Sequence, residues 1–194
     1  MQIVTRELRR LERPKLARHL RALEAEDRRL RFGLAVGDGA IDDYVARIDF
    51  GRDAVFGVFD GSLELAGAAH LARADAHAEL GVSVLSAHRG RGIGAALLAR
   101  AHGHARNWGI ATLFMHCLTE NGAMMHLAQK QGMRIVVESG EADAHLELPP
   151  PSPASIAQAL FDERVGLFDY ALKSQVEAVN RLILAGVFTV PPSR

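Results

Sequence analysis

A glycine- and arginine-rich turn near the middle of the chain could bind an anion. It follows the apolar stretch 82–85 and leads directly into an alanine- and leucine-rich stretch at 95–98. Glycines let a backbone approach a ligand closely, and successive N–H groups at a helix N-terminus form a cradle for phosphate. Arginine adds positive charge and can grip phosphate through paired hydrogen bonds. We interpret the turn as a pyrophosphate site made by Arg89, Gly90, Arg91, Gly92, Ile93 and Gly94.

Two nucleotide-binding motifs are excluded by the residues around this turn. The spacing from Gly90 through Gly92 to Ala95 matches a dinucleotide fingerprint, which needs an acidic residue about 20 positions on to hold the ribose. The chain has no acidic residue there before Glu120. The fingerprint also belongs to an early strand–turn–helix unit, whereas this turn lies near the middle of the chain. A P-loop is excluded because no Gly-Lys-Ser/Thr follows.

The turn and its flanks resemble the GNAT superfamily of N-acyltransferases. Arg89, Gly92 and Gly94 match the R-x-x-G-x-G motif with which that family holds the pyrophosphate of acyl-coenzyme A. Residues 78–84 resemble its acyl-carrying strand, and 119–133 resemble its second signature, an Asn that opens a helix closing at a glycine. The resemblance covers about residues 1–148, and it implies acetyl-CoA as co-substrate.

The resemblance also implies roles for residues around a gap between the fourth and fifth strands. In the family a bulge in the fourth strand opens this gap, and the pantetheine arm enters it. Val82 and Val84 would hold the thioester through their backbone, with one N–H polarising its carbonyl. Asn121 would hydrogen-bond the pantetheine or position a water, which is compatible with an ordinary helix N-cap.

A base is needed for the reaction, because a protonated amine has no lone pair with which to attack. Glu79 is the first candidate, since the family often places a glutamate just before the acyl-binding stretch. It could equally be an ordinary carboxylate on a strand surface. His116, on the fifth strand, is the second candidate. Glu120 is the third, and it could simply favour the N-terminus of the following helix.

The acid that the family commonly uses is absent. A tyrosine usually stands four residues before the glycine that ends the Asn helix, and Gly132 places that position at Ala128. Alanine cannot donate a proton, so the thiolate leaves unaided or another acid acts, with His126 and Cys117 as conceivable substitutes. Ala128 also resembles a variant seen in GNAT domains of bacterial protein-lysine acetyltransferases.

Composition narrows the class of protein. A chain of 194 residues with 48% hydrophobic content suits one domain plus an extension. The formal net charge is zero, so we expect neither nucleic acid nor an anionic membrane as partner. The single cysteine, the lack of a signal peptide and the lack of a membrane-length apolar run favour a cytoplasmic location. The histidines lack zinc spacing, so no metal is expected.

Hydrophobic periodicity and turn chemistry predict the elements that must position these residues. They give a mixed α/β (α+β) fold, a mainly antiparallel sheet flanked by helices on both faces, with a C-terminal helical extension. Before the turn we expect strands at 2–5, 53–60, 63–73 and 77–85, and helices from Pro14 to about 32 and near 40–49. After it we expect helices at 92–107 and 121–131 and strands at 111–118, 133–138 and 143–148.

The prolines at 149–151 end the last strand and divide the chain. The acyltransferase domain would occupy 1–148, a proline-rich linker 149–153 and a helical extension 154–194. Gly166 could split the extension into two helices. Its apolar stripe must be buried on the domain's own back or on a second subunit, and we favour a homodimer. The stripe comprises Phe161, Val165, Phe168, Leu172, Val176, Val179 and Ile183.

These features lead to two functional hypotheses. The first is an N-acetyltransferase that moves an acetyl group from acetyl-CoA to a primary amine of a small molecule or a protein lysine, by direct attack in a ternary complex. The alternative is a non-catalytic acyl-CoA-binding regulatory module, suggested by Ala128 and the helical extension. Both require coenzyme A binding, and only turnover separates them.

Overall fold

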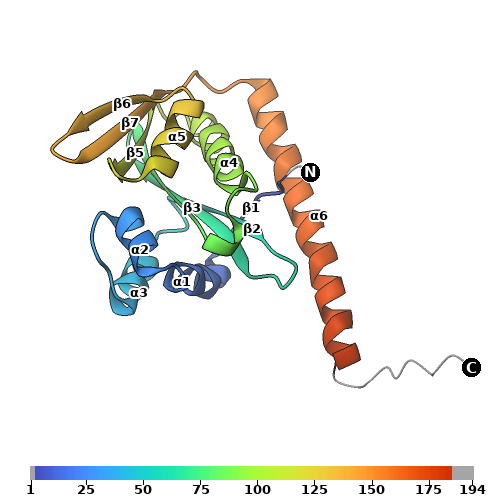
Figure 1. The fold of residues 1–194 in the computed structure, drawn as a ribbon. Helices are drawn as coiled ribbons and strands as arrows, with labels where there is room; N and C mark the ends of the chain where they lie inside the picture. Colours follow the sequence, from blue (N-terminus) through green and yellow to red (C-terminus); the bar gives the residue numbers. More distant parts are fainter. Residues whose placement is uncertain (1–2, 185–194) are drawn as a thin grey trace, which may run out of the picture.

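A seven-stranded sheet forms the centre of the computed structural model, which describes residues 3–184 (Figure 1). The strand order is β1-β2-β3-β4-β5-β7-β6, and only the β4–β5 pair is parallel. The predicted mixed, mainly antiparallel sheet is therefore confirmed. The strands are β1 (Arg6–Glu7), β2 (Ala54–Phe59), β3 (Leu65–Ala74), β4 (His77–Val84), β5 (Thr112–Leu118), β6 (Arg134–Glu138) and β7 (Glu141–Glu147).

Helices cover both faces of the sheet (Figure 1). On one face lie α1 (Arg13–Arg21), α2 (Ala25–Phe32) and α3 (Asp38–Arg47), with the short turn η1 (Arg10–Glu12) before them. On the other lie α4 (Ile93–Asn107), preceded by η2 (Ser86–His88), and α5 (Gly122–Lys130). Because both faces are covered, every residue of β2 is buried. The apolar stripe of α4, namely Ile93, Leu97, Ala101 and Ala105, lies in the core.

Two expectations about the N-terminal third are wrong. The first strand pair begins at Arg6 instead of 2–5; Met1 and Gln2 lie outside the described residues. The expected long helix is two helices, because Leu23 turns into the core and Glu24 is extended at the N-cap of α2. This break turns α2 towards the ends of β4 and β5, where the candidate site lies.

Most of the N-terminal arginines hold the helices α1, α2 and α3 on the domain through ion pairs. Arg18 pairs with Glu64, Arg21 with Asp42 and Arg28 with Asp38. Arg13 instead donates to the backbone oxygens at the end of α3. Their positive charges therefore have partners within the domain.

The strands β4 and β5 diverge along their length. They pair only from His77 to Glu79 on β4 and Thr112 to Phe114 on β5. Beyond this point β5 remains paired with β7, and β4 remains paired with β3. The β3–β4 register is continuous, so the bulge expected in the fourth strand is not found there. The gap instead arises because each strand follows a different neighbour.

The C-terminal element α6 (Pro153–Leu184) is one helix of 32 residues. Ser152 and Ser155 form reciprocal hydrogen bonds at its start, which cap the N-terminus of the helix. Gly166 does not split the helix. It is buried where α6 crosses the N-terminal segment, and a Cβ there would lie 2.5 Å from the backbone oxygen of Thr5.

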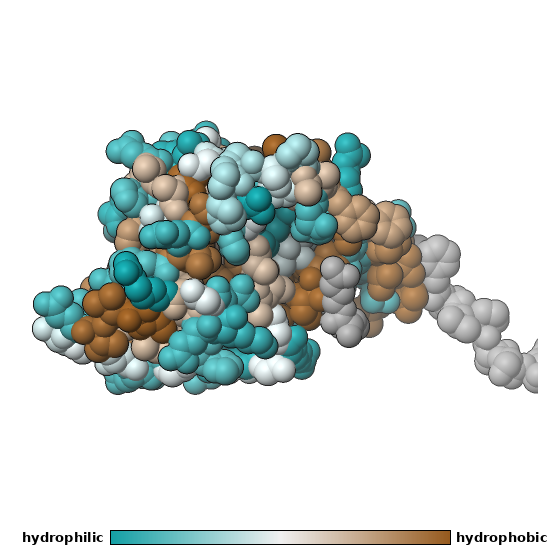
Figure 2. Space-filling model, turned by 90° about the horizontal axis from the view of Figure 1, so that it is seen from above, coloured by the Kyte–Doolittle hydropathy of each residue, from teal (hydrophilic) through white to brown (hydrophobic). Residues whose placement is uncertain are grey.

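One face of α6 packs against its own domain. Glu163 pairs with Arg100 of α4 at 2.6 Å, and Lys173 donates to the backbone oxygen of Phe59 at 2.8 Å. The Tyr170 ring stacks edge-on against Phe59. At about 100° per residue, this inner face lies opposite the apolar stripe. Figure 2 accordingly shows hydrophobic surface where α6 lies, and the exposed stripe includes Phe161, Phe168, Leu172, Val176, Val179 and Ile183.

Within residues 3–184 no helix is long and apolar enough to cross a membrane.

Candidate functional site

The glycine turn leaves backbone donors pointing at open space. Gly90 and Gly92 have φ of 74° and 83°, and no heavy atom lies within 4 Å of a Cβ built on either. Gly92 is the N-cap of α4 and provides no side-chain cap. The first intrahelical hydrogen bond runs from Ala96 N to Gly92 O, so the N–H groups of the preceding turn have no helical acceptor. With the positive end of the helix dipole they favour an anion.

A cavity of about 370 Å³ opens beside these donors, and we call it the turn cavity. Its walls are the glycine turn, the end of β4, the first turns of α5 and one side of α2. Predicted site residues found in its wall are Val82, Val84, Arg89, Gly90, Gly92, Ile93, Gly94 and Asn121. Lys130, at the end of α5, adds a cation that the sequence reasoning missed, because its position suits an ordinary helix C-terminus.

The two predicted phosphate-binding arginines have protein partners in this structure. Arg89 pairs with Asp27 of α2 at 2.5 Å and donates to the backbone oxygen of Val84 at 3.3 Å. Arg91 is exposed and donates to the backbone oxygen of Ala87 at 3.3 Å. Arg89 thus joins α2 to the turn, whereas Arg91 is not part of the cavity wall.

The backbone of β4 offers hydrogen-bonding groups to the gap. Leu85 N donates to Ala66 O on the β3 side, and Ala76 O accepts from Ala111 N on the β5 side. Since backbone groups alternate along a strand, even-numbered residues of β4 direct theirs towards β5. Past Glu79 they meet no β5 partner. Val82 therefore presents its backbone groups to the gap, and Val84 presents its N–H, since the oxygen of Val84 accepts from Arg89.

A buried histidine supports the wall between these two valines. His19 of α1 contacts the backbone oxygen of Leu65 through Nδ1 at 2.8 Å and the Ser83 hydroxyl through Nε2 at 2.9 Å. Burial lowers the pKa of His19 to about 4, so the ring is neutral near pH 7. With Nδ1 donating to the carbonyl, Nε2 accepts from the Ser83 hydroxyl. No motif marks this contact, because its partners lie far apart in sequence.

Asn121 is the N-cap of α5. Its Oδ1 accepts from Met124 N at 3.1 Å, and its Nδ2 donates to Leu30 O of α2 at 3.4 Å. The N-cap part of the expectation is therefore observed, and the side chain also ties α5 to α2. Its predicted role towards pantetheine stays a prediction.

A second cavity, of about 230 Å³, lies on the other side of the gap, and we call it the charged cavity. Glu79 and His116 both line it, so the structure brings the first two candidate bases together. Leu30 and Arg31 line both cavities, which places α2 where the two meet. Tyr44 and His70 also line its wall, although no sequence pattern links them to this site.

The candidate bases differ in their surroundings. His116 contacts Asp143 of β7 at 2.7 Å, and this hydrogen bond raises the pKa of His116 and favours its protonated form. Glu120 pairs with Arg29 at 2.6 Å and lines neither cavity. Glu79 is exposed to the charged cavity and has no ion pair among residues 3–184.

The candidates for the missing acid lie in different cavities. Ala128 is buried in the core at 1% exposure. His126 lines the turn cavity and Cys117 the charged cavity, where burial raises the pKa of the Cys117 thiol. Within the described part of the chain, no group of three or more His, Cys, Asp or Glu side chains could hold a metal ion.

Solved structures share this fold. The GNAT domain of S. lividans PAT matches with a TM-score of 0.64 and 21% identity, covering 74% of this chain and 89% of that chain. The structure of yncA from Salmonella typhimurium, described with its cofactor acetyl-CoA, matches with a TM-score of 0.59 and 16% identity, covering 78% and 97%. The ribosomal-protein-alanine N-acetyltransferase from Brucella melitensis matches with a TM-score of 0.57 and 18% identity, covering 75% and 99%.

A search of curated protein sequences returns no match. The model of the acetyltransferase (GNAT) family, in contrast, matches residues 18–133. That segment is more than half of the chain and contains the glycine turn, the diverging strand β4 and the Asn-capped helix α5. The chain therefore belongs to the acetyltransferase (GNAT) family and is an N-acetyltransferase, a class of enzyme that uses acetyl-CoA.

Proposed function

We propose that the protein transfers the acetyl group of acetyl-CoA to a primary amine by direct attack within a ternary complex. The observation that carries this proposal is the pair of cavities that meet at Leu30 and Arg31 beside the β4–β5 gap. The turn cavity has the donors for a pyrophosphate, and the charged cavity has a free carboxylate for an amine. Two substrates could thus meet across the gap.

The turn cavity fits the coenzyme chemically. The first-turn N–H groups of α4 and the side chain of Lys130 suit phosphate oxygens, and the apolar walls formed by Val82 and Met124 suit the pantetheine chain. In this structure Arg89 pairs with Asp27. When the coenzyme binds, we expect Arg89 to shift part of its hydrogen bonding from Asp27 to phosphate. Free N–H groups of β4 would polarise the thioester carbonyl.

In the proposed reaction Glu79 acts as the base. The ammonium first loses a proton to Glu79, and the freed lone pair forms the N–C bond to the thioester carbon. The C–S bond breaks with its electron pair on sulfur, and the second nitrogen proton ends on the thiolate. The products are an amide, the free thiol of coenzyme A and one released proton, so charge and atoms balance.

The alternative, a non-catalytic acyl-CoA-binding module, has less support. Family membership favours turnover. The charged cavity next to the coenzyme position would also have no purpose in a module that only binds acyl-CoA. We place the reaction in the cytoplasm, which the single free cysteine supports.

A thiol-release assay tests the proposal. Purified full-length protein is given acetyl-CoA with panels of small amines and lysine-containing peptides, and free coenzyme A is measured. We expect release that depends on an acceptor. Coenzyme binding by calorimetry without release in any panel would instead support the binding module.

We also propose a homodimer formed through α6. We divide the chain into a catalytic domain at 1–148, a linker at 149–153 and an extension at 154–194. The last ten residues of the extension lie outside the described part of the chain. Most of the stripe on α6 is exposed, so its own domain leaves it largely uncovered. Lys173 pairs with Asp169 and Arg181 with Glu177 along the same helix.

A further inference from the structure

An arginine without a charged partner lies where the two cavities meet. Arg31 of α2 lines both, and its guanidinium lies directly over Gly81 of β4, where a Cβ would collide with it. Its neighbours differ: Arg28 pairs with Asp38, and Arg29 pairs with Glu26 and Glu120. Within residues 3–184 Arg31 makes no ion pair, and its single hydrogen bond to protein goes to the Tyr44 hydroxyl at 3.0 Å.

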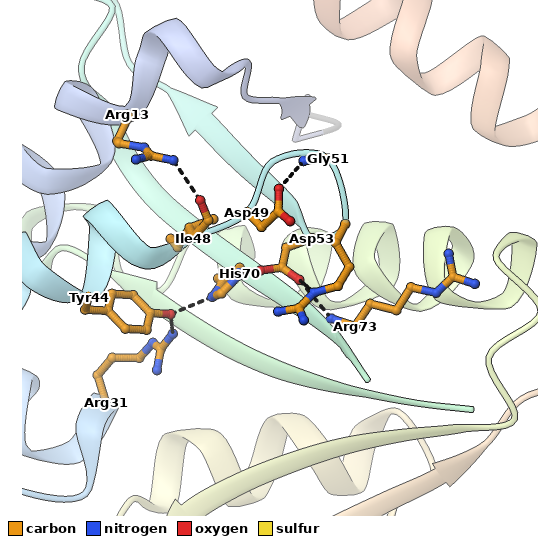
Figure 3. Close-up of polar contacts among 10 residues, drawn as sticks. Arg13, Arg31, Tyr44, Ile48, Asp49, Gly51, Asp53, His70 and Arg73 are labelled. Atoms are coloured by element: carbon orange, nitrogen blue, oxygen red, sulfur yellow. Dashed lines mark hydrogen bonds and ion pairs between the residues drawn. The ribbon is translucent and has the colours of Figure 1, made fainter. Parts of the chain in front are cut away.

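A chain of hydrogen bonds holds this arginine in place (Figure 3). Tyr44 oxygen accepts from Arg31, and its hydroxyl lies 2.6 Å from Nδ1 of His70. Burial lowers the pKa of His70 and favours the neutral ring, so Nδ1 accepts from Tyr44 while Nε2 faces Asp53 at 3.4 Å. Asp53 also accepts from Arg73 N at 3.2 Å, which anchors the chain to β3.

Two aromatic rings flank the guanidinium. Its central carbon lies 5.0 Å from the centre of the Phe32 ring and 5.7 Å from that of Tyr44. Arginine has several N–H donors in a rigid fork, and the bond to Tyr44 uses only one. The remaining donors are free to grip a carboxylate through two parallel hydrogen bonds.

A negative charge, that of Glu79, lies near Arg31 on the same face of β4 as Gly81. Glu79 precedes Gly81 by two residues, so about 7 Å separates their Cα atoms along β4, and both positions face the charged cavity. The cavity therefore presents a carboxylate for an ammonium next to a guanidinium for a carboxylate. At about 230 Å³ it is smaller than the pockets that hold drug-sized ligands.

We propose that the acetyl acceptor is a small amino acid-like molecule, whose carboxylate binds Arg31 while its amine faces Glu79. This inference rests on the proposed acetyl transfer and names its substrate class. A lysine side chain within a protein carries no carboxylate close to its amine, so it would leave Arg31 without a partner. The Tyr44–His70–Asp53 chain then acts as a positioning device for Arg31.

The test compares acceptors that differ only in the carboxylate. Full-length protein with acetyl-CoA is assayed for thiol release with the standard L-amino acids, with the amide of each, and with a lysine-containing peptide. A charge-assisted hydrogen bond contributes about 1.5–3 kcal/mol, so we expect at least one amino acid to exceed its amide by about 10- to 100-fold in kcat/KM. Equal values for every acid–amide pair, or a preference for the peptide, would overturn the inference.

Variants locate the effect at Arg31. Arg31→Gln should raise KM for the amino acid by about the same 10- to 100-fold and leave KM for the amide within about threefold. Arg31→Lys should restore part of the preference. Arg29→Gln, the same change two residues earlier on α2, should keep the full preference. An equal loss for acid and amide in Arg31→Gln would mean a structural role only.

Calorimetry separates the failure of this inference from failure of the proposed function. The same acids and amides are titrated into protein saturated with coenzyme A, which requires no turnover. Preferential binding of acids that Arg31→Gln abolishes, without thiol release, would refute acetyl transfer and retain the carboxylate site. Thiol release from amines without any such preference would refute the carboxylate site and retain acetyl transfer.

Discussion

The turn cavity and the charged cavity meet at Arg31 but are built in different ways. Half of the residues lining the turn cavity belong to one continuous segment, which runs from β4 through the glycine turn into α4, and the donors of this segment are backbone N–H groups. The charged cavity gathers side chains from α2, α3, β3, β4 and β5. Its character depends on Arg31, Tyr44, His70 and Glu79, whose partners are far apart in sequence.

This difference matches the two tasks we propose. A coenzyme common to a whole family can be held by backbone groups, which depend on local conformation more than on side-chain identity. The acceptor differs between enzymes, so its cavity is defined by side chains that can change one at a time. Substitutions in one cavity should therefore affect one substrate and spare the other.

The largest effect should come from the base. Glu79→Gln keeps the size of the side chain but removes its ability to take a proton, so we expect kcat to fall by about 10²–10⁴-fold. The affinity for acetyl-CoA, measured by calorimetry, should stay within about threefold, because Glu79 lines only the charged cavity. A loss of kcat under threefold would assign proton removal to water or another group. His116→Gln is the control, and its effect should be the smaller of the two.

A substitution in the glycine turn should instead weaken coenzyme binding in the turn cavity. Gly92→Asp places a carboxylate where the pyrophosphate should lie; two charges at about 4 Å near a surface cost about 4 kcal/mol, which is about a thousand-fold in affinity. Calorimetry with acetyl-CoA measures this loss. Gly109→Asp is a matched control, since Gly109 also has a positive φ of 75° and open space but lines neither cavity. Undiminished binding in a folded Gly92→Asp protein would remove the basis for the coenzyme site.

The same contrast explains how far the sequence predicts the structure. Residues 77–133 were predicted nearly to the residue, because β4, the turn, α4 and α5 each carry local signals: alternation, glycines, an apolar stripe and an Asn cap. In the wall of the charged cavity, the sequence predicts site residues only at Glu79, His116 and Cys117. Its other members depend on the break at Leu23–Glu24, which swings α2 over β4, and no local pattern reports such long-range contacts.

The helix α6 shows a second limit of what hydrophobic periodicity predicts. Periodicity correctly predicts one apolar stripe on the extension, but it cannot say which face meets the domain. Gly166 and Tyr170 decide that, through a close backbone approach and a ring contact at the opposite face. A glycine that looked like a helix break is instead the point where the helix crosses the N-terminal segment.

Acidification should weaken the wall of the turn cavity through His19. The folded-state pKa of about 4 is below the usual 6.5, so the neutral ring contributes stability at pH 7 that is lost as pH falls from about 6.5 towards 4. By pH 5 this loss is about 2 kcal/mol.

Urea unfolding of wild type and His19→Gln at pH 7 and pH 5 measures this contribution. The difference in unfolding free energy between the two proteins should shrink by about 2 kcal/mol at the lower pH. Burial also lowers the pKa of His104 to about 4, so His104→Gln should show a similar pH effect. Only His19→Gln should also weaken acetyl-CoA binding, because His19 holds Ser83 in the turn cavity. A pH-independent difference for His19 would contradict the buried neutral ring.

Substitutions in the apolar stripe of α6 should change catalysis least, because the stripe lies in neither cavity. The full-length protein should scatter light as a dimer, with twice the chain mass of 21.0 kDa. Phe168→Glu combined with Val176→Glu charges the exposed stripe, where these side chains are 67% and 58% exposed, and should yield the monomer mass. Because the inner face of α6 is untouched, kcat and acetyl-CoA affinity should stay within about twofold, since distant sites act independently.

A matched variant separates the stripe from charge in general. Ala178→Glu adds the same charge to an exposed position on the flank of α6 and should remain a dimer. A wild-type mass of 21.0 kDa at micromolar concentration would sink the dimer. A dimer that survives both glutamates would move the interface elsewhere. A loss of activity in the monomer would mean that α6 influences the two cavities. The independence of α6 from the catalytic site would then no longer hold.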